Sequence, residues 1–233
     1  MERIFVFNLI NPFGGADDYI HPAVMPEDDK LVLVDCGYPG FLPAIESALA
    51  AEDLSCGNIS KIVITHHDHD HMGALAAFKR RYPSVQVVAS RMEAPYITGE
   101  KKSLRLIQAE SLQEKLPEDQ KAYGLAFCNA LRSVEPAGVD IEVKDGDFFN
   151  WCGGCRIIQT PGHTPGHISL YLENEKTVIT GDAATAEKGR LEIANPQFAL
   201  DIEMAKESLV KIQGLGADTF ICYHGGILKW NNQ

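Results

Sequence analysis

Residues 62–73 read Ile62-Val63-Ile64-Thr65-His66-His67-Asp68-His69-Asp70-His71-Met72-Gly73. The first three residues are apolar and β-branched, which is typical of a strand buried on both faces. Four of the chain's eight histidines and two aspartates follow at once. Imidazole nitrogen and carboxylate oxygen are ligand types that zinc, iron and manganese share. The stretch therefore predicts a metal site at the end of a buried strand.

The side chains of this cluster are not equivalent. Along an extended segment, successive side chains point to opposite sides, so we expect His66, Asp68 and Asp70 on one side and the intervening histidines on the other. His71 falls where the chain turns into the next helix, so it can rejoin the first set. The alternative is an exposed histidine-rich loop without function, and the ordered placement between a strand and a helix argues against it.

Three more segments place a histidine or an aspartate after a predicted strand. They are the proline- and glycine-rich loop 160–167 with His163, the segment 178–182 with Asp182, and the segment 221–226 with His224. Taken alone, each of these histidines is more often a core residue than a ligand. Together they supply ligands from separate strand ends, which is how loops on a rigid scaffold build a site.

The rest of the chain alternates strand and helix patterns. Strands are expected at 4–9, 31–34, 62–65, 85–89, 156–160, 167–172, 177–180 and 219–222, and helices at 39–51, 74–81 and about 201–212. Residues 91–132 are expected to be a helical insertion that forms a pocket wall or lid. Its aromatic residues are expected to be packing residues, with substrate contact as the alternative. Without a linker or repeat, residues 1–233 are expected to form a single domain.

Composition narrows the function classes. The chain has 233 residues with 21 Lys and Arg against 32 Asp and Glu, and its net charge is −11. This acidic balance disfavours binding to nucleic acid. An apolar run of about 20 residues and a basic leader are both missing, so we expect a cytoplasmic protein that does not bind membranes. The expected partner is a small-molecule substrate, and the oligomeric state is left open.

The six cysteines are irregularly spaced and are expected to be reduced thiols. Cys152 and Cys155 have the spacing of a metal-binding pair, but a structural zinc site needs a second pair. We interpret residues 152–155 as a hairpin turn built on two glycines, with a zinc or redox role as the alternative.

The order of these motifs resembles the metallo-β-lactamase superfamily of metal-dependent hydrolases, with glyoxalase II and the lactonases among its members. The resemblance is carried by residues 32–37, by Thr65-His66 with Asp70-His71-x-Gly73, and by residues 161–167, and it extends to His224. It implies an α/β fold, an αβ/βα four-layer sandwich of two mixed β-sheets flanked by helices. The observed alternation of strands and helices agrees with this architecture but does not select it.

The resemblance also implies a site for two divalent metal ions at one sheet edge. The implied ligands are His66, Asp68 and His163 for one ion, Asp70, His71 and His224 for the other, and Asp182 between them. Asp70 is implied to orient the attacking water and to move its proton. Asp35 is implied to support the ligands through hydrogen bonds, and His167 is expected to be a supporting or core residue rather than a ligand.

Asp68 departs from the commoner family pattern, which has a histidine at this position. An oxygen ligand is harder than imidazole, so it shifts the preference of the first metal site toward manganese or iron. It also gives the site three carboxylates. We expect zinc in the two positions, with manganese or iron as the alternatives.

The expected function is hydrolysis of an ester-like carbonyl in a thioester, a lactone or another small ester by a hydroxide bound to two metal ions. Tyr223 is expected to donate a hydrogen bond to the developing oxyanion. The alternatives are a di-iron or mono-iron oxidoreductase of the same superfamily and a non-catalytic metal-binding protein. A nuclease is disfavoured because basic residues are few.

Overall fold

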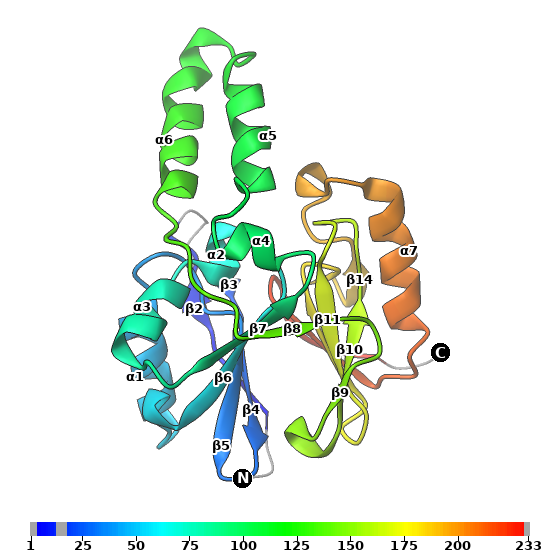
Figure 1. Ribbon diagram of the computed structural model, residues 1–233. Coiled ribbons are helices and arrows are strands. Elements are labelled where there is room, and N and C mark those ends of the chain that lie inside the picture. Colours follow the sequence, from blue (N-terminus) through cyan, green and yellow to red (C-terminus); the bar gives the residue numbers. More distant parts are fainter. Residues whose placement is uncertain (1–3, 13–17, 231–233) are drawn as a thin grey trace.

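The computed structural model describes residues 4–12 and 18–230. Two six-stranded sheets lie against each other at its centre, in the orders β1-β4-β5-β6-β7-β8 and β16-β15-β12-β11-β10-β9 (Figure 1). The strands of the first sheet are β1 (Phe5–Val6), β4 (Ala23–Glu27), β5 (Lys30–Val34), β6 (Ile59–Ile64), β7 (Gln86–Ser90) and β8 (Ile141–Val143). Those of the second are β9 (Phe148–Phe149), β10 (Cys155–Gln159), β11 (Ile168–Leu172), β12 (Thr177–Gly181), β15 (Thr219–Cys222) and β16 (Gly226–Lys229).

Both sheets are mixed. Strands β5, β6, β7 and β8 pair in parallel, whereas β1, β4 and β5 pair antiparallel. In the second sheet, β12 and β15 pair in parallel and the other neighbours are antiparallel. Two short hairpins add β2 (Leu9–Ile10) with β3 (Tyr19–Ile20), and β13 (Thr185–Glu187) with β14 (Arg190–Glu192).

Helices cover the outer face of each sheet (Figure 1). Helices α1 (Leu42–Ala51) and α3 (Leu75–Arg81) pack on the first sheet, and α7 (Ile202–Gln213) packs on the second. The alternation of side chains along the strands explains this layering. In β6, Ile62 and Ile64 pack with the helices, while Val63 points toward the other sheet. The structure thus confirms the predicted four-layer αβ/βα sandwich.

A helical hairpin stands between β7 and β8, where residues 91–132 were expected to be helical. It contains α4 (Ala94–Ile97), α5 (Leu104–Gln113) and α6 (Lys121–Arg132), and the last two run side by side and project beyond the sheets (Figure 1). The Ser103 side chain accepts a hydrogen bond from the Leu106 amide and so caps α5. The hairpin has a small core of its own at Ala109, Cys128 and Leu131.

Several strands were not predicted. The strand expected at 4–9 is divided into β1 and β2, which belong to different sheets. Strand β4 was missed because it includes Pro26, and β8 because it lies in an acidic run interpreted as a solvated surface or hairpin. Strand β16 alternates between buried and exposed residues at a sheet edge, and it lacks the apolar run that marked its neighbour.

The connection around Cys152 is the predicted hairpin turn. Residues Trp151–Gly153 form a 3₁₀ turn, η3, and the strands on either side pair with Cys155 opposite Phe149. Cys152 and Gly153 both have positive φ angles. All six cysteines are free and buried. Burial raises the pKa of the Cys152 thiol to about 11, which disfavours the thiolate that metal binding or redox chemistry needs.

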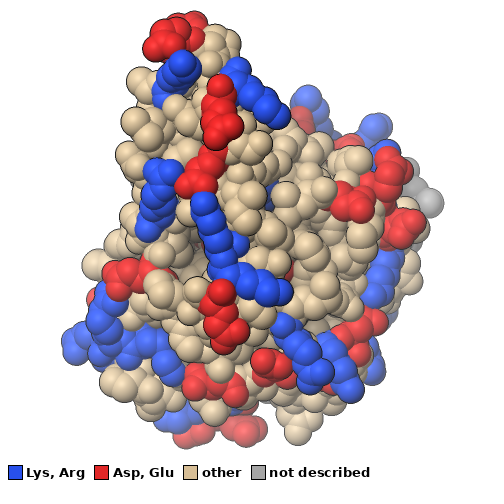
Figure 2. All heavy atoms as spheres, turned by 45° about the horizontal axis from the view of Figure 1, so that its top comes forward, with Lys and Arg blue, Asp and Glu red and all other residues tan. Residues whose placement is uncertain are grey.

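Charged side chains of both signs are interspersed over the face of the molecule that carries the hairpin (Figure 2). On this face the Lys and Arg side chains alternate with Asp and Glu rather than merging into a broad basic surface. Among the described helices, none is long and apolar enough to cross a membrane.

The loop between β10 and β11 leaves no room for a side chain at Gly162. Its φ angle is +133°, and a Cβ atom there would lie 2.3 Å from the backbone nitrogen of Ala205 in α7. We expect Gly162→Ala to lower the free energy of unfolding by about 2 kcal/mol or more, because either the loop or α7 has to move.

Urea unfolding of the variant measures this effect. Gly138→Ala is the matched control, because its Cβ would meet no atom within 4 Å and its φ is not in the left-handed region. Equal midpoints for the two variants would contradict the packing described for this loop.

Candidate metal centre

The structure brings the seven predicted ligand residues together at one edge of the two sheets. His66 and Asp68 follow β6, and Asp70 and His71 lie in the single-turn helix α2 (His69–Met72). His163 comes from the loop between β10 and β11. Asp182 follows β12 and His224 follows β15. The chain turns into α2 directly after Asp68, and this turn brings His71 back to the same side as His66.

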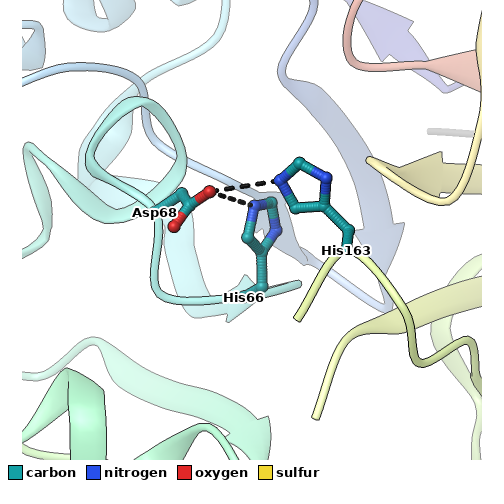
Figure 3. A group of neighbouring side chains, drawn as sticks. All are labelled: His66, Asp68 and His163. Carbon is teal, nitrogen blue, oxygen red and sulfur yellow. Dashed lines mark hydrogen bonds and ion pairs between the residues drawn. The ribbon is translucent and has the colours of Figure 1, made fainter. Parts of the chain in front are cut away.

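The first group consists of His66, Asp68 and His163 (Figure 3). Asp68 Oδ2 lies 3.6 Å from His66 Nε2 and 3.1 Å from His163 Nε2. All three side chains are buried. In Figure 3 the Asp68 carboxylate points toward both rings, although His163 comes from a distant part of the chain.

The second group consists of Asp70, His71 and His224. Asp70 Oδ2 lies 3.2 Å from His224 Nε2 and 3.7 Å from His71 Nε2. Asp182 joins the two groups, because its Oδ1 lies 3.3 Å from His71 Nε2 and its Oδ2 lies 3.4 Å from His163 Nε2. One carboxylate therefore faces both groups with different oxygen atoms.

Several buried atoms of these residues make no hydrogen bond within the described chain. They are His66 Nε2, Asp68 Oδ1, His71 Nε2, His163 Nδ1, Asp182 Oδ1 and His224 Nε2. A buried polar atom left without a partner costs about 1–3 kcal/mol. Several such atoms, all of ligand type and gathered in one place, fit a site for divalent cations, and the donor set matches nitrogen- and oxygen-binding metals.

Neighbouring side chains of opposite charge stabilise the ionised forms of the residues in the centre. Burial alone would raise the pKa of Asp68, but the charge of Arg105, the hydrogen bond with His163 and the nearby His66 imidazole hold it well below its usual range. Burial lowers the pKa of His71, and the carboxylates around it, Asp182 first, more than reverse this effect. The imidazole of His71 therefore holds a proton that a divalent cation would have to displace.

Asp35 supports two of the predicted ligands through hydrogen bonds, as the resemblance implied. Its Oδ2 accepts hydrogen bonds of 2.8 Å from both Thr65 Oγ1 and His71 Nδ1, and its Oδ1 accepts one of 2.9 Å from the Thr65 amide. Thr65 Oγ1 also lies 3.1 Å from His66 Nδ1. These contacts place the Nδ1 protons away from the centre and direct Nε2 of both imidazoles into it.

His167 is a supporting residue rather than a ligand, as predicted. Its Nε2 accepts a 2.9 Å hydrogen bond from the Asp182 amide, so its Nδ1 carries the proton shared with Thr160 Oγ1 at 2.8 Å. Both ring nitrogens are thus used. The prediction for Tyr223 was wrong: its buried hydroxyl donates to the backbone oxygen of Asp70 at 2.5 Å and is not available to an oxyanion.

Two supporting residues were not predicted. Glu93 is fully buried and joins the two ligand loops, because Oε1 accepts from Thr164 Oγ1 and the Gly166 amide at 2.8 Å, and Oε2 contacts the His67 ring. Arg105 of α5 reaches Asp68. Nothing in the sequence around either residue marked it, since both act through side chains 26 or more positions away.

A cavity of about 360 Å³ opens onto the centre. Five of the predicted ligand residues line it: Asp68, Asp70, His163, Asp182 and His224. Its lining also includes four aromatic side chains: Tyr38, Tyr123, Phe127 and Phe198. Two of these, Tyr123 and Phe127, come from α6, so the helical hairpin forms part of the cavity wall.

Comparisons with known proteins agree with this fold. A family model described as the metallo-beta-lactamase superfamily matches residues 23–224. The chain is 28% identical over 212 residues to the probable metallo-hydrolase YflN of Bacillus subtilis (strain 168), which covers 85% of this chain and 76% of that protein. It is 29% identical over 186 residues to a hydroxyacylglutathione hydrolase of Nitrobacter winogradskyi, 78% of this chain but only 54% of that protein.

A crystal structure of a metallo-beta-lactamase family protein from Thermus thermophilus superposes with a TM-score of 0.74 at 21% identity, over 97% of this chain and 74% of the other. At this level of identity the likeness shows the fold.

The hydrogen bonds of Asp35 lead to a prediction. We expect Asp35→Asn to lower metal affinity about 10- to 100-fold, because an amide nitrogen facing His71 Nδ1 cannot accept its proton and the ring loses its orientation. Titration of the chelator-treated protein with Zn²⁺ measures the change. Glu142→Gln, which alters an exposed pair with Arg91, is the control. Unchanged affinity in Asp35→Asn would contradict the supporting role.

Proposed function

This chain belongs to the metallo-β-lactamase superfamily, and from that premise we propose that it is a metal-dependent hydrolase of small, uncharged ester-like substrates. The observation that carries the proposal is the convergence of imidazoles and carboxylates, nearly all of them buried, on one cavity. Similarity to a probable metallo-hydrolase and to a hydroxyacylglutathione hydrolase supports hydrolysis.

We assign His66, Asp68 and His163 to a first metal position and Asp70, His71 and His224 to a second, with Asp182 facing both. Zinc is the metal we propose, with manganese or iron as the alternatives. Divalent ions held there would polarise the substrate carbonyl and lower the pKa of the attacking water. Among the protein's own atoms, the Asp182 oxygens lie where one carboxylate can serve both positions.

Asp70 is the proposed proton acceptor. Burial alone would raise its pKa, but the neighbouring His71 and His224 lower it, so the carboxylate is ionised. The hydroxyl of Tyr223 fixes the backbone of Asp70, and the carboxylate faces the cavity. An ionised carboxylate held in this way can orient a water molecule and accept its proton.

The cavity wall indicates the class of substrate. Tyr38, Phe127 and Phe198 offer aromatic surface for an apolar acyl or leaving group. Arg105 is the one Lys or Arg side chain among the described residues that line the cavity, and its donors are taken by protein acceptors. Asp18 adds a further acidic side chain. Since the donors of Arg105 are taken, no Lys or Arg side chain among the described lining residues is free to bind a carboxylate, which favours a neutral ester, lactone or thioester over a glutathione thioester.

The free, buried cysteines are what a protein of a reducing compartment contains. On this ground we propose the cytoplasm as its location.

The proposed function predicts metal-dependent turnover. We expect protein purified without chelator to contain zinc and to hydrolyse p-nitrophenyl butyrate or a γ-lactone faster than S-lactoylglutathione, with activity lost on chelation and restored by Zn²⁺. Asp70→Asn should lower kcat by about 100-fold or more. Glu142→Gln, an exposed substitution, is the control.

Each other outcome points to a specific alternative. Bound iron without turnover on any ester would favour an oxidoreductase, and tightly bound zinc without turnover would favour a non-catalytic metal-binding protein. Faster hydrolysis of S-lactoylglutathione than of the neutral esters would contradict the inference from the cavity charges.

A further inference from the structure

Arg105 is an arginine buried at the first metal position. Its side chain is 3% exposed and reaches the centre from the first turn of α5. Nε and Nη2 both donate to Asp68 Oδ2, at 3.0 and 2.8 Å. Nη2 also lies 3.2 Å from His163 Nε2. One guanidinium group thus contacts two of the three residues of that position.

The other side of the guanidinium is held equally firmly. Nη1 donates to Gln108 Oε1 and to the backbone oxygen of Phe198, both at 2.6 Å. The group also stacks over the Phe198 ring, 5.1 Å from its centroid. A guanidinium has five N–H donors, no acceptor and a permanent charge. Since protein atoms take its donors on every side, Arg105 is fixed in place.

These contacts compete with a metal ion at the first position. An imidazole nitrogen has one lone pair, so His163 Nε2 cannot accept from Arg105 and bind a cation at the same time. If Nε2 instead carries its own proton toward Asp68, its lone pair is equally unavailable, and only Nδ1 of this ring is left without a partner in the described chain. Asp68 Oδ2 already accepts two charge-assisted hydrogen bonds, which leaves Oδ1 as the one oxygen of this carboxylate without a partner among the described residues. A divalent cation there also meets the positive charge of Arg105.

The second position has no such competitor. Within the described residues, the recorded ion pairs of Asp70 are all with histidines, and so are those of Asp182. His71 Nε2 faces only carboxylates and makes no hydrogen bond. Among the ion pairs of the described residues, the arginine beside the first position therefore has no counterpart at the second.

We propose that Arg105 is a built-in counter-cation of the first position, which makes the two metal positions unequal: the second binds metal tightly and the first weakly. Arg105 is a positioning residue that neutralises Asp68. The inference rests on the ligand assignment of the proposed function. Because Arg105 is anchored on α5, filling the first position also shifts the helical hairpin that forms the cavity wall.

Zn²⁺ titration of the chelator-treated full chain tests the proposal. We expect two binding classes whose dissociation constants differ about tenfold or more. His66→Ala should remove only the weaker class and His224→Ala only the tighter class. Hydrogen exchange at residues 104–132 should change when the weaker class fills and not before. Equal classes, or the reverse assignment, would overturn the proposal.

Substitution of Arg105 gives the sharper test. Arg105→Met should tighten the weaker class about tenfold or more and leave the tighter class unchanged. Arg105→Lys keeps the charge but loses the planar guanidinium group. The dissociation constant of its weaker class should lie between those of Arg105→Met and the unaltered protein. Arg132→Met is the matched control, because Arg132 pairs with Glu110 on the same hairpin, away from the ligands.

Weaker binding at the first position in both Arg105 variants, with circular dichroism showing them folded, would mean that Arg105 supports the metal and would overturn the proposal. If Arg105→Met does not fold, Arg105→Lys decides alone, since its first position must then be tighter than in the unaltered protein. Unequal binding without ester hydrolysis contradicts only the proposed function, whereas equal binding with hydrolysis contradicts only this inference.

Discussion

Buried negative charge is the constraint on which this structure depends. Asp35, Asp68, Asp70, Glu93 and Asp182 are all at most 9% exposed and lie around one edge of the two sheets. Taking a carboxylate out of water costs several kcal/mol unless hydrogen bonds or opposite charges compensate it. Each of the five is compensated in its own way, and the compensating groups come from segments far apart in the chain. The edge can form only when both sheets, the ligand loops and the hairpin are in place together.

The compensation falls into two kinds. Asp35 and Glu93 are surrounded by hydrogen-bond donors of the ligand loops, so they stabilise the loops and leave no atom for a metal ion. Asp70 and Asp182 are compensated by histidines that share their protons, a state that a divalent cation can replace. The carboxylates held by hydrogen-bond donors maintain the geometry of the edge. The carboxylates paired with histidines remain able to bind a metal ion. Asp68 combines histidine partners with a permanent cation, Arg105.

Sequence patterns predicted the part of this arrangement that is local. A buried strand followed by residues 66–71 predicts ligands at the end of a strand. His163, Asp182 and His224 likewise follow predicted strands. The four-layer fold followed from a resemblance rather than from periodicity, and strands such as β8 were missed because edge strands lack a continuous apolar run. Glu93 and Arg105 could not be predicted, since their roles exist only once β7 and α5 are packed beside loops distant in sequence.

Arg105 connects the hairpin that lines the cavity to the first proposed metal position. The hairpin that supplies Tyr123 and Phe127 to the cavity wall also supplies the cation that neutralises Asp68. A change in hairpin sequence that reshapes the cavity therefore acts on the first metal position through the same helices. The second position, built from α2 and the end of β15, receives no hairpin residue among its recorded ion pairs in the described chain. Of the two proposed metal positions, one is therefore built by the sheet framework alone, and the other also depends on the hairpin that lines the cavity.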